Sequence, residues 1–370
     1  MRRKFFIIAG EVSGDIHGSL LMNSMCKLND SCEFAGIGGV QMESKGLSSM
    51  FPLEKMSIMG FVEVIKHLSF FKEVEKKVIE EISKFSPERI IMIDYPGFNL
   101  RVARKIKKQF NIPITYYISP QIWAWKEGRI KNIKKYIDQM LVIFPFEKEW
   151  YSQYDYNVEW VGHPFLENWE HTSKSNIKAK LGVDSQKFLL TLFPGSRKQE
   201  FDKHLKICLD AAQRVINEIK DVQVTIGLSP NLTINKKEIP SNIIIESENP
   251  RMALEAADAA IVASGTSTLE ASIYATPMVI IYKMNIISWW LSKLLVKTKF
   301  SGMPNIISNK MIVPELLQSE ATPEAISNNI IKIIKPGFER ENMLKHLNDV
   351  RDSLGDGNSS IKAAKLILGI

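Results

Sequence analysis

Cysteine is scarce in this 370-residue sequence, which contains only Cys26, Cys32 and Cys208. The number is odd, and neither a C-x-x-C pair nor a zinc-ligand spacing occurs. A disulfide framework or a cysteine-rich metal site would need such pairs. We therefore expect reduced thiols in the core of a cytoplasmic protein.

Long apolar runs are missing as well. No segment approaches the roughly 20 apolar residues that cross a bilayer. The short run after "MRRK" meets Glu11 and Asp15 where a signal peptide would have a cleavage site. The N-terminus is therefore interpreted as a buried strand, and the protein is expected to be soluble or to lie on a membrane surface.

Cofactor and nucleic-acid signatures are also absent. Glycines 10, 14 and 18 match neither G-x-G-x-x-G nor G-x-x-x-x-G-K-[ST], which argues against a nicotinamide-dependent dehydrogenase. His17 and His163 form no metal-ligand spacing, so we expect no cofactor and no metal. Like charges form no block, so no nucleic-acid partner is expected. The net charge of +7 favours phosphorylated ligands or acidic lipid, or simply reflects a lysine-coated surface.

What the sequence does contain is an alternation of short apolar runs with longer helical patterns. Continuously apolar strands separated by helices are typical of parallel sheets buried on both faces. The predicted strands are 4–10, 89–94, 114–119, 139–144, 188–194, 222–227, 242–247, 259–264 and 278–283, and the helical patterns include 74–85 and 205–219.

The alternation breaks at the polar stretch 161–176. We therefore predict an α/β fold of two facing Rossmann-like, doubly wound domains, residues 1–165 and 166–344, with a cleft between them. The last part, about 345–370, ends in an amphipathic helix with Asn358 or Ser359 as its N-cap. It either packs back on the first domain or reaches a partner subunit.

Ligands of such folds bind at the carboxyl ends of the strands. In the first half, Asp94 ends an apolar strand beside a Pro-Gly turn. Apolar walls raise the pKa of a carboxylate and suit a general base. The alternative is an Asp that only organises its own turn.

In the second half, two loops after strands suggest a nucleotide-diphosphate site. Ser196 and Arg197 offer a hydroxyl and a guanidinium fork suited to phosphate. Gly265 and Thr266 begin a helix whose first N–H groups and dipole favour a diphosphate. Glu270 lies one turn further and could accept hydrogen bonds from two ribose hydroxyls. Either loop alone could be simple capping.

Two stretches, 61–71 and 286–300, carry more apolar residues than one core-facing stripe requires. The second combines tryptophans with lysines, which suits a lipid interface. We expect both to contact membrane or acyl chains, with a buried helix or a dimer contact as the alternative. The residues concerned are Phe61, Val62, Val64, Ile65, Leu68, Phe71, Trp289 and Trp290.

An ordered set of short motifs resembles the lipid-A-disaccharide synthase family and covers most of the chain. The motifs are "AGEVSGD" (9–15), "GIGG" (36–39), "MGFVEV" (59–64), "IDYPGFN" (93–99), "YYISPQIWAWKEGR" (116–129), "FPFEKEWY" (144–151), "VGHP" (161–164), "PGSR" (194–197), "ASGTSTLE" (263–270) and "SGMPNII" (301–307).

The resemblance implies a hexosyltransferase with two Rossmann-like domains of the GT-B type. Such an enzyme joins UDP-2,3-diacylglucosamine to 2,3-diacylglucosamine 1-phosphate. It forms a β-1,6-linked disaccharide with inversion and releases UDP. We expect it to work without a metal and to lie on the inner, cytoplasmic face of the inner membrane, bound to an anionic surface. A homodimer is a further option.

The same resemblance assigns roles to individual residues. Asp94 would take the proton from the acceptor 6-hydroxyl. The UDP contacts would be Ser196, Arg197, Gly265, Thr266, Glu270 and Asn305. We place Glu11, Ser13, Trp123, Trp125, Lys126 and Arg129 on the acceptor side. The two rings would form a wall, and the two cations would lie near the acceptor phosphate. Alternatively, the rings wedge the loop against its own domain.

The sequence departs from the family pattern at two positions. Gly97 stands where many members carry a second acid, so a scheme with two carboxylates there fails and the role falls to Asp94. His17 stands where relatives have an aliphatic residue, which makes it a second candidate base. Two rival classes stay open: a UDP-sugar epimerase of the same architecture, and a non-enzymatic lipid or nucleotide carrier.

Overall fold

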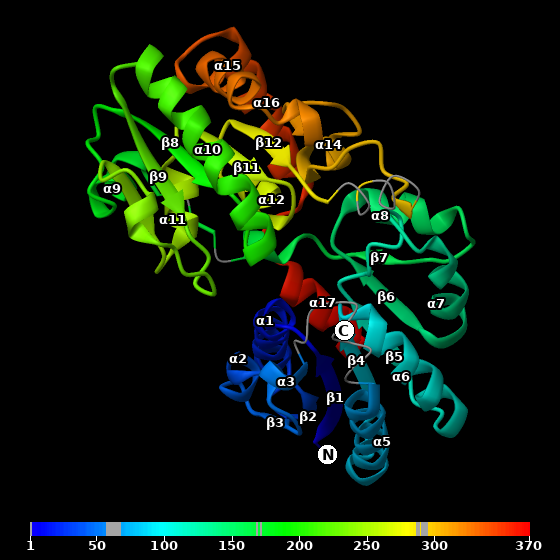
Figure 1. Ribbon diagram of the computed structural model, residues 1–370. Coiled ribbons are helices and arrows are strands. Elements are labelled where there is room, and N and C mark those ends of the chain that lie inside the picture. The colour runs from blue at the N-terminus through cyan, green and yellow to red at the C-terminus, as the bar shows by residue number, and fades with distance from the viewer. Residues whose placement is uncertain (1, 57–67, 168, 171, 286–288, 290–294) are drawn as a thin grey trace. The chain divides into compact units, whose positions relative to one another are not determined.

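The computed structural model describes residues 2–56, 68–167, 169–170, 172–285, 289 and 295–370 (Figure 1). The chain divides into two compact units. Unit 1 is Met1–Asn168 with Leu354–Ile370, and unit 2 is Trp169–Ser353. The chain therefore leaves unit 1 after residue 168, where 165 was predicted, and returns after residue 353, where 344 was predicted.

Unit 1 is built on a parallel sheet with the strand order β3-β2-β1-β4-β5-β6-β7. Its strands are β1 (Arg3–Ala9), β2 (Cys32–Ile37), β3 (Leu47–Ser49), β4 (Arg89–Ile93), β5 (Ile114–Tyr117), β6 (Gln139–Val142) and β7 (Glu159–Trp160). Its helices are α1 (Val12–Leu28), α2 (Val40–Glu43), α3 (Leu53–Met56), α5 (Leu68–Phe85), α6 (Pro96–Gln109), α7 (Ile130–Tyr136), α8 (Pro145–Ser152) and α17 (Ser359–Leu368), with short 3-10 turns at Glu127–Arg129 and Pro164–Leu166.

Helices cover both faces of this sheet because successive strand residues point to opposite sides. Phe6 and Ile8 pack in one core with the apolar faces of α5, α6 and α7. On the other face, a Cβ at Gly18 of α1 would lie 3.1 Å from the Ile93 side chain. α17 lies beside α1 (Figure 1), and the Ser24 and Ser360 hydroxyls are 2.7 Å apart. The C-terminal helix therefore packs back on unit 1, and Asn358 is its N-cap.

Unit 2 repeats the plan with the strand order β10-β9-β8-β11-β12-β13, again all parallel. Its strands are β8 (Phe188–Phe193), β9 (Val222–Gly227), β10 (Ile243–Glu246), β11 (Ala259–Ala263), β12 (Met278–Tyr282) and β13 (Glu315–Leu317). Its helices are α9 (Lys174–Lys180), α10 (Lys198–Glu218), α11 (Pro250–Ala256), α12 (Thr266–Ile273), α14 (Met303–Ser308), α15 (Pro323–Ile334) and α16 (Phe338–Ser353), with 3-10 turns at Lys236–Glu238 and Gln318–Glu320.

The core of unit 2 also has two sides. Leu190 and Leu192 of β8 belong to the larger apolar cluster with α10 and α15. Leu189, the residue before Leu190, packs with Ile177 of α9 and Ala253 of α11. Both units are thus doubly wound, as predicted. Of the helices described, none has the length and apolar character that would carry it through a membrane.

Candidate active site

Asp94 follows β4 at the carboxyl edge of the unit 1 sheet, and its backbone is held from two sides. Its amide donates to the Tyr117 carbonyl at 3.1 Å, and its carbonyl accepts from the Asn99 side chain at 2.7 Å and from the Tyr116 hydroxyl. Asp94 and Tyr95 have left-handed backbones, with φ of 42° and 50°. Such a conformation costs about 1–3 kcal/mol per non-glycine residue and concentrates at functional sites.

The Asp94 carboxyl is half-buried, and its pKa is raised from 3.8 to about 7. Burial is the larger cause, and the negative charge of Glu11 is the second. Glu11 follows the neighbouring strand β1, where it is the N-cap of α1. The raised pKa agrees with the expectation from the sequence, and a carboxyl that titrates near neutrality suits proton abstraction.

Gly10, just after β1, leaves room for the ring of Tyr95, which follows β4. A Cβ on Gly10 would lie 2.2 Å from the ring of Tyr95. The hydroxyl of that ring donates to the Met56 carbonyl at 2.7 Å. A larger residue at position 10 would displace Tyr95 and disturb its neighbour Asp94. Ser13, predicted on the acceptor side, is exposed in the first turn of α1.

Asp15, at the end of the "AGEVSGD" motif, has a structural role. Its carboxylate accepts the amides of Gly39, Gln41 and Met42 at 2.8–3.1 Å and so holds the start of α2. A Cβ on Gly39 would lie 2.6 Å from an Asp15 oxygen. The "AGEVSGD" and "GIGG" motifs are therefore contact partners, a pairing that sequence spacing does not reveal.

The two tryptophans of the 119–129 loop have different surroundings. Trp123 is buried; its Nε1 donates to Glu147 at 3.1 Å, and its ring meets Phe146 edge-on at 4.9 Å. Trp125 is 42 % exposed. The predicted wall of two rings is therefore wrong for Trp123, because that ring wedges the loop against unit 1. Of the two rings, only that of Trp125 is exposed.

Two cations flank the exposed ring. The Nζ of Lys126 lies 4.1 Å from the centre of the Trp125 ring, and the guanidinium carbon of Arg129 lies 5.9 Å from it. Burial lowers the pKa of Arg129, and the electrostatic influence of Tyr116 opposes this. Because Tyr116 bonds to the Asp94 carbonyl, this cation pair belongs to the same edge of the sheet as the candidate base.

His17 is buried in α1, and the centre of its ring lies 5.9 Å from that of Phe165. His163 stands close by, and its pKa is lowered to about 3, first by burial and then by the charge of His17. These rings lie where the chain leaves unit 1. A role for His17 as the base stays a prediction.

In unit 2, Arg197 follows β8 and is the N-cap of α10. Its side chain is largely exposed, and its guanidinium pairs with Glu200 at 3.2 Å. The Tyr282 hydroxyl donates to the same Glu200 oxygen at 3.2 Å. Ser196 is exposed beside Arg197. The loop thus presents a cation and a hydroxyl to solvent, and their predicted contact with UDP stays a prediction.

His204, which the sequence did not indicate, fastens this loop. Its Nδ1 donates to the Pro194 carbonyl at 2.7 Å, and its Nε2 accepts the Lys283 amide at 2.8 Å. The ring is fully buried, and burial lowers its pKa. A neutral His204 therefore ties the end of β8 to the end of β12.

The loop after β11 leads into α12, with Gly265 as its N-cap at φ 147°. Thr266 begins the helix and is exposed. Glu270 has a pKa raised by burial, although its pairing with Arg251 at 2.9 Å opposes the rise. Arg251, from α11, was not predicted. No motif marks Arg251 in the sequence, and only the folded structure shows its contact with Glu270.

Asn305 does not fit the predicted direct contact with UDP. It is fully buried; its amide nitrogen bonds to the Val313 carbonyl and Glu315, and its oxygen accepts the amides of Ile312 and Val313, all at 2.7–3.0 Å. Glu315 also accepts the Ser301 and Gly302 amides. The Asn305 side chain thus uses its hydrogen-bonding groups to shape the 301–315 segment.

Most of the residues predicted to contact the membrane lie outside the part of the chain that the structure describes. Phe61, Val62, Val64, Ile65 and Trp290 are not among the described residues, nor is the side chain of Leu68. The predicted membrane contact is wrong for Phe71, because its side chain is buried in the core of unit 1 against Phe98. Trp289 is half-buried, whereas Leu295 and Val296, a few residues on, are exposed.

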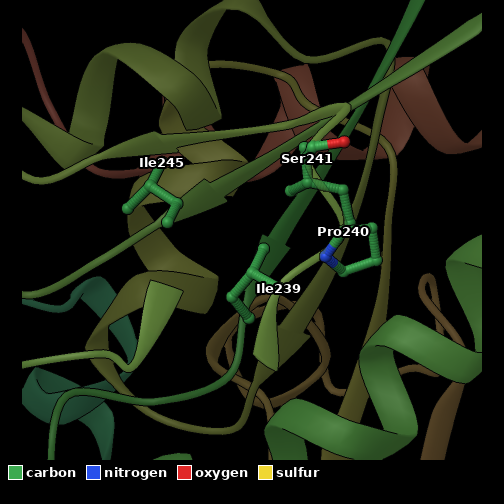
Figure 2. A pocket seen from close by; sticks show the side chains of 5 residues that line it. Ile239, Pro240, Ser241 and Ile245 are labelled. Atoms are coloured by element: carbon green, nitrogen blue, oxygen red, sulfur yellow. The ribbon is translucent and has the colours of Figure 1, made fainter. Parts of the chain in front are cut away.

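A surface hollow beside the outer strand β10 is not part of this arrangement. It is lined by Ile239, Pro240, Ser241, Ile243 and Ile245 (Figure 2). None of these residues follows β8, β11 or β12, and none carries a charge. The candidate site residues Asp94, Arg197 and Thr266 follow strands at the carboxyl edges of the two sheets instead.

Solved structures place this fold in a known class. A UDP-GlcNAc 2-epimerase from Neisseria meningitidis, solved with UDP-GlcNAc, matches with a TM-score of 0.67 and 11% identity over 100% of both chains. A calicheamicin glycosyltransferase matches with a TM-score of 0.63 and 12% identity, over 100% of this chain and 98% of that one. At such identities the likeness shows the fold alone. It is the two-domain GT-B architecture shared by glycosyltransferases and epimerases.

Sequence comparison narrows this class to one family. The model of the lipid-A-disaccharide synthetase family matches residues 5–367. A lipid-A-disaccharide synthase of Myxococcus xanthus is 34% identical over 99% of this chain and 97% of its own length. One of Coxiella burnetii is 35% identical over 99% and 98%. The chain belongs to the lipid-A-disaccharide synthetase family, which consists of hexosyltransferases, and neither rival class is favoured.

Proposed function

We propose that this protein transfers the diacylglucosamine unit of UDP-2,3-diacylglucosamine to the 6-hydroxyl of 2,3-diacylglucosamine 1-phosphate. The products are the β-1,6-linked disaccharide 1-phosphate and UDP, with inversion at the anomeric carbon. The observation that carries the proposal is the family match over residues 5–367. The two sheet edges supply the groups that this reaction needs.

Asp94 is the proposed general base. Its pKa of about 7 leaves a substantial ionised fraction at neutral pH. The carboxylate accepts the proton of the acceptor 6-hydroxyl as the oxygen attacks the anomeric carbon. Such help contributes about 10²–10⁴-fold. Asp94 is preferred to His17 because the structure holds its backbone rigidly at the sheet edge.

The leaving UDP is the proposed ligand of unit 2. Negative charge develops on the diphosphate as the bond to the sugar breaks. Arg197 and Ser196 offer a guanidinium and a hydroxyl, and the first turn of α12 at Thr266 offers N–H groups together with the positive end of a helix dipole. Glu270 would accept hydrogen bonds from the ribose, with Arg251 fixing its carboxylate.

The acceptor is the proposed ligand of the unit 1 edge. Trp125 offers an exposed ring to the sugar, and Lys126 and Arg129 beside it offer charge to the 1-phosphate. Glu11 acts on the reaction through the pKa of Asp94. Ser13, exposed in the first turn of α1, completes the proposed acceptor side.

We also propose that catalysis needs no metal ion, because Arg197 and the α12 terminus can offset the diphosphate charge. Within the described segments, no group of three or more His, Cys, Asp or Glu side chains is placed to hold a metal. The experiment is direct: excess EDTA should leave the rate unchanged. A loss of activity that Mg²⁺ restores would contradict this part of the proposal.

Membrane association is a further part of the proposal. The exposed Leu295 and Val296 stand beside Lys297 and Lys299, a pattern suited to an anionic lipid surface. The net charge of +7 adds attraction. We expect the protein at the cytoplasmic face of the inner membrane, and salt should release it from anionic vesicles.

A homodimer is a further option for this protein. Light scattering of the purified protein would detect it.

One assay separates this function from its rivals. Purified protein is mixed with UDP-diacylglucosamine and the 1-phosphate acceptor, and the product is read by mass. Disaccharide and UDP should form only when both substrates are present. Conversion of the UDP-sugar alone would indicate an epimerase, and binding without UDP release would indicate a carrier.

A further inference from the structure

The loop that presents Trp125 is fastened to one short helix at regular intervals. Three loop residues, each four positions after the last, bond to α8 or to the residues just beyond it. The pairs are Ser119 with Tyr151, Trp123 with Glu147, and Glu127 with Tyr154. The motifs "SPQIWAWKEGR" and "FPFEKEWY" are therefore two halves of one contact.

Glu147 is the centre of this contact. It is fully buried, a position that a carboxylate occupies only with good partners. One oxygen accepts Trp123 Nε1 at 3.1 Å, and the other accepts the amides of Ile143 and Phe144 at 3.1 and 3.0 Å. A single side chain thus joins the loop to the end of β6 and the start of α8.

The anchored Trp123 determines where the next residues lie. Trp125 stands two positions later and is exposed, and Lys126 turns the chain with a left-handed φ of 56°. The cation of Lys126 and that of Arg129 lie against the Trp125 ring. We therefore expect the Trp123–Glu147 hydrogen bond to help hold the Trp125 ring, Lys126 and Arg129 in place.

We propose that Glu147 is a positioning residue that sets acceptor affinity by holding Trp123, and through it Trp125, Lys126 and Arg129. Glu147 itself lies beneath the loop and does not touch substrate. The inference rests on the proposed function, because the acceptor sugar phosphate is the ligand that these three residues would bind.

The test compares Glu147→Gln, Trp123→Phe and the double variant. Gln keeps the size of Glu but puts an NH₂ donor against either the indole N–H or the backbone amides, so one of these bonds is lost. The acceptor KM should rise about tenfold, equivalent to about 1.4 kcal/mol, with the donor KM within about twofold of wild type. The double variant should be no worse than the single ones, since both break the same bond.

Glu149→Gln is the matched control, because Glu149 is exposed on the same helix. It should leave both KM values unchanged. A merely structural role for Glu147 would instead lower the melting temperature and kcat while both KM values stay constant. That result, or additive effects in the double variant, would overturn the proposal.

A second readout does not depend on activity. Trypsin cuts after lysine and arginine, so loosening the loop should speed cleavage after Lys126 or Arg129 in Glu147→Gln but not in Glu149→Gln. Unchanged cleavage would contradict the positioning role. If the wild-type protein made no disaccharide, the proposed function would fail, and the proteolysis would still decide whether Glu147 holds the loop.

Discussion

The carboxyl edges of the two sheets carry different candidate groups, and we propose that the two edges have different tasks. At the unit 1 edge, Asp94 and Glu11 follow the neighbouring strands β4 and β1, and burial together with the negative charge of Glu11 raises the pKa of Asp94 to about 7. At the unit 2 edge, Arg197 and the first turn of α12 present positive charge. One edge is suited to taking a proton, and the other is suited to receiving negative charge.

The backbone differs in the same way. In unit 1 the residues with left-handed φ after β4 and β5 are Asp94, Tyr95 and Ile118, none of them glycine. In unit 2 the turns after β8 and β11 use Gly195 and Gly265, with φ of 127° and 147°. Strained side-chain-bearing residues fix a reactive group in one place, whereas glycines bring backbone N–H groups close to a ligand. This difference agrees with the proposal that a side chain of unit 1 acts in catalysis, whereas the backbone and a cation of unit 2 bind the ligand.

The sharpest way to break this comparison is to remove the base. Asp94→Asn keeps the shape of the side chain but cannot accept the proton, and kcat should fall about 10²–10⁴-fold. Initial rates of UDP release measure the loss. Asp155→Asn is the control, since Asp155 is exposed and also has a left-handed backbone, φ 51°. Full activity of Asp94→Asn would remove Asp94 from the mechanism.

The next largest effect should come from the cation of unit 2. Arg197→Ala should lower kcat by about 10²–10³-fold, the range seen when one donor to a developing negative charge is lost. Arg197→Lys should retain part of the rate, because it keeps charge without the planar fork. Lys198→Ala, one residue on and equally exposed, should change little. Equal losses at 197 and 198 would show that the effect is only a general surface charge.

The smallest effect concerns pH and sharpens the assignment within unit 1. A carboxyl with a raised folded pKa is protonated between pH 3.8 and about 7, where its unfolded form is ionised. Its contribution to stability is therefore lost as pH rises through that window, while the active ionised form accumulates. The acid limb of kcat/KM should lie near pH 7, and Glu11→Gln should move it to lower pH.

Glu33→Gln is the control for this shift, because Glu33 lies near the N-terminal end of strand β2, whereas Asp94 and Glu11 lie at the carboxyl edge of the sheet. It should leave the acid limb in place. An acid limb that does not move in Glu11→Gln would mean that a group other than Asp94 controls the rate.

The sequence predicted most of the fold because buried parallel strands are continuously apolar. Each of the nine predicted strands is present within a residue or two of its predicted ends. The strands that were missed are short or carry polar and glycine residues: β2, β3, β7 and β13. Two- and three-residue edge strands such as β7 and β3 have no period to detect, since their pairing depends on the neighbouring strand.

The candidate site was predicted less completely, for a reason visible in three residues. Asp94 could be found because it ends an apolar run. Trp123 and Asn305 were predicted to contact ligands, yet each donates a hydrogen bond to a carboxylate of the protein: Trp123 to the buried Glu147, and Asn305 to the half-buried Glu315. Those partners are 24 and 10 residues away. A motif shows which residues matter, but only the fold shows what each one touches.

The central claim is that the unit 2 edge binds UDP, whereas Asp94 at the unit 1 edge acts in catalysis. The affinity of the protein for UDP alone tests this claim most directly. Isothermal titration calorimetry would compare the wild-type protein with Arg197→Ala and Asp94→Asn. The account predicts that Arg197→Ala weakens UDP binding at least about tenfold, or about 1.4 kcal/mol, and that Asp94→Asn leaves it within about twofold. Wild-type affinity in Arg197→Ala, or an equal loss in Asp94→Asn, would contradict it.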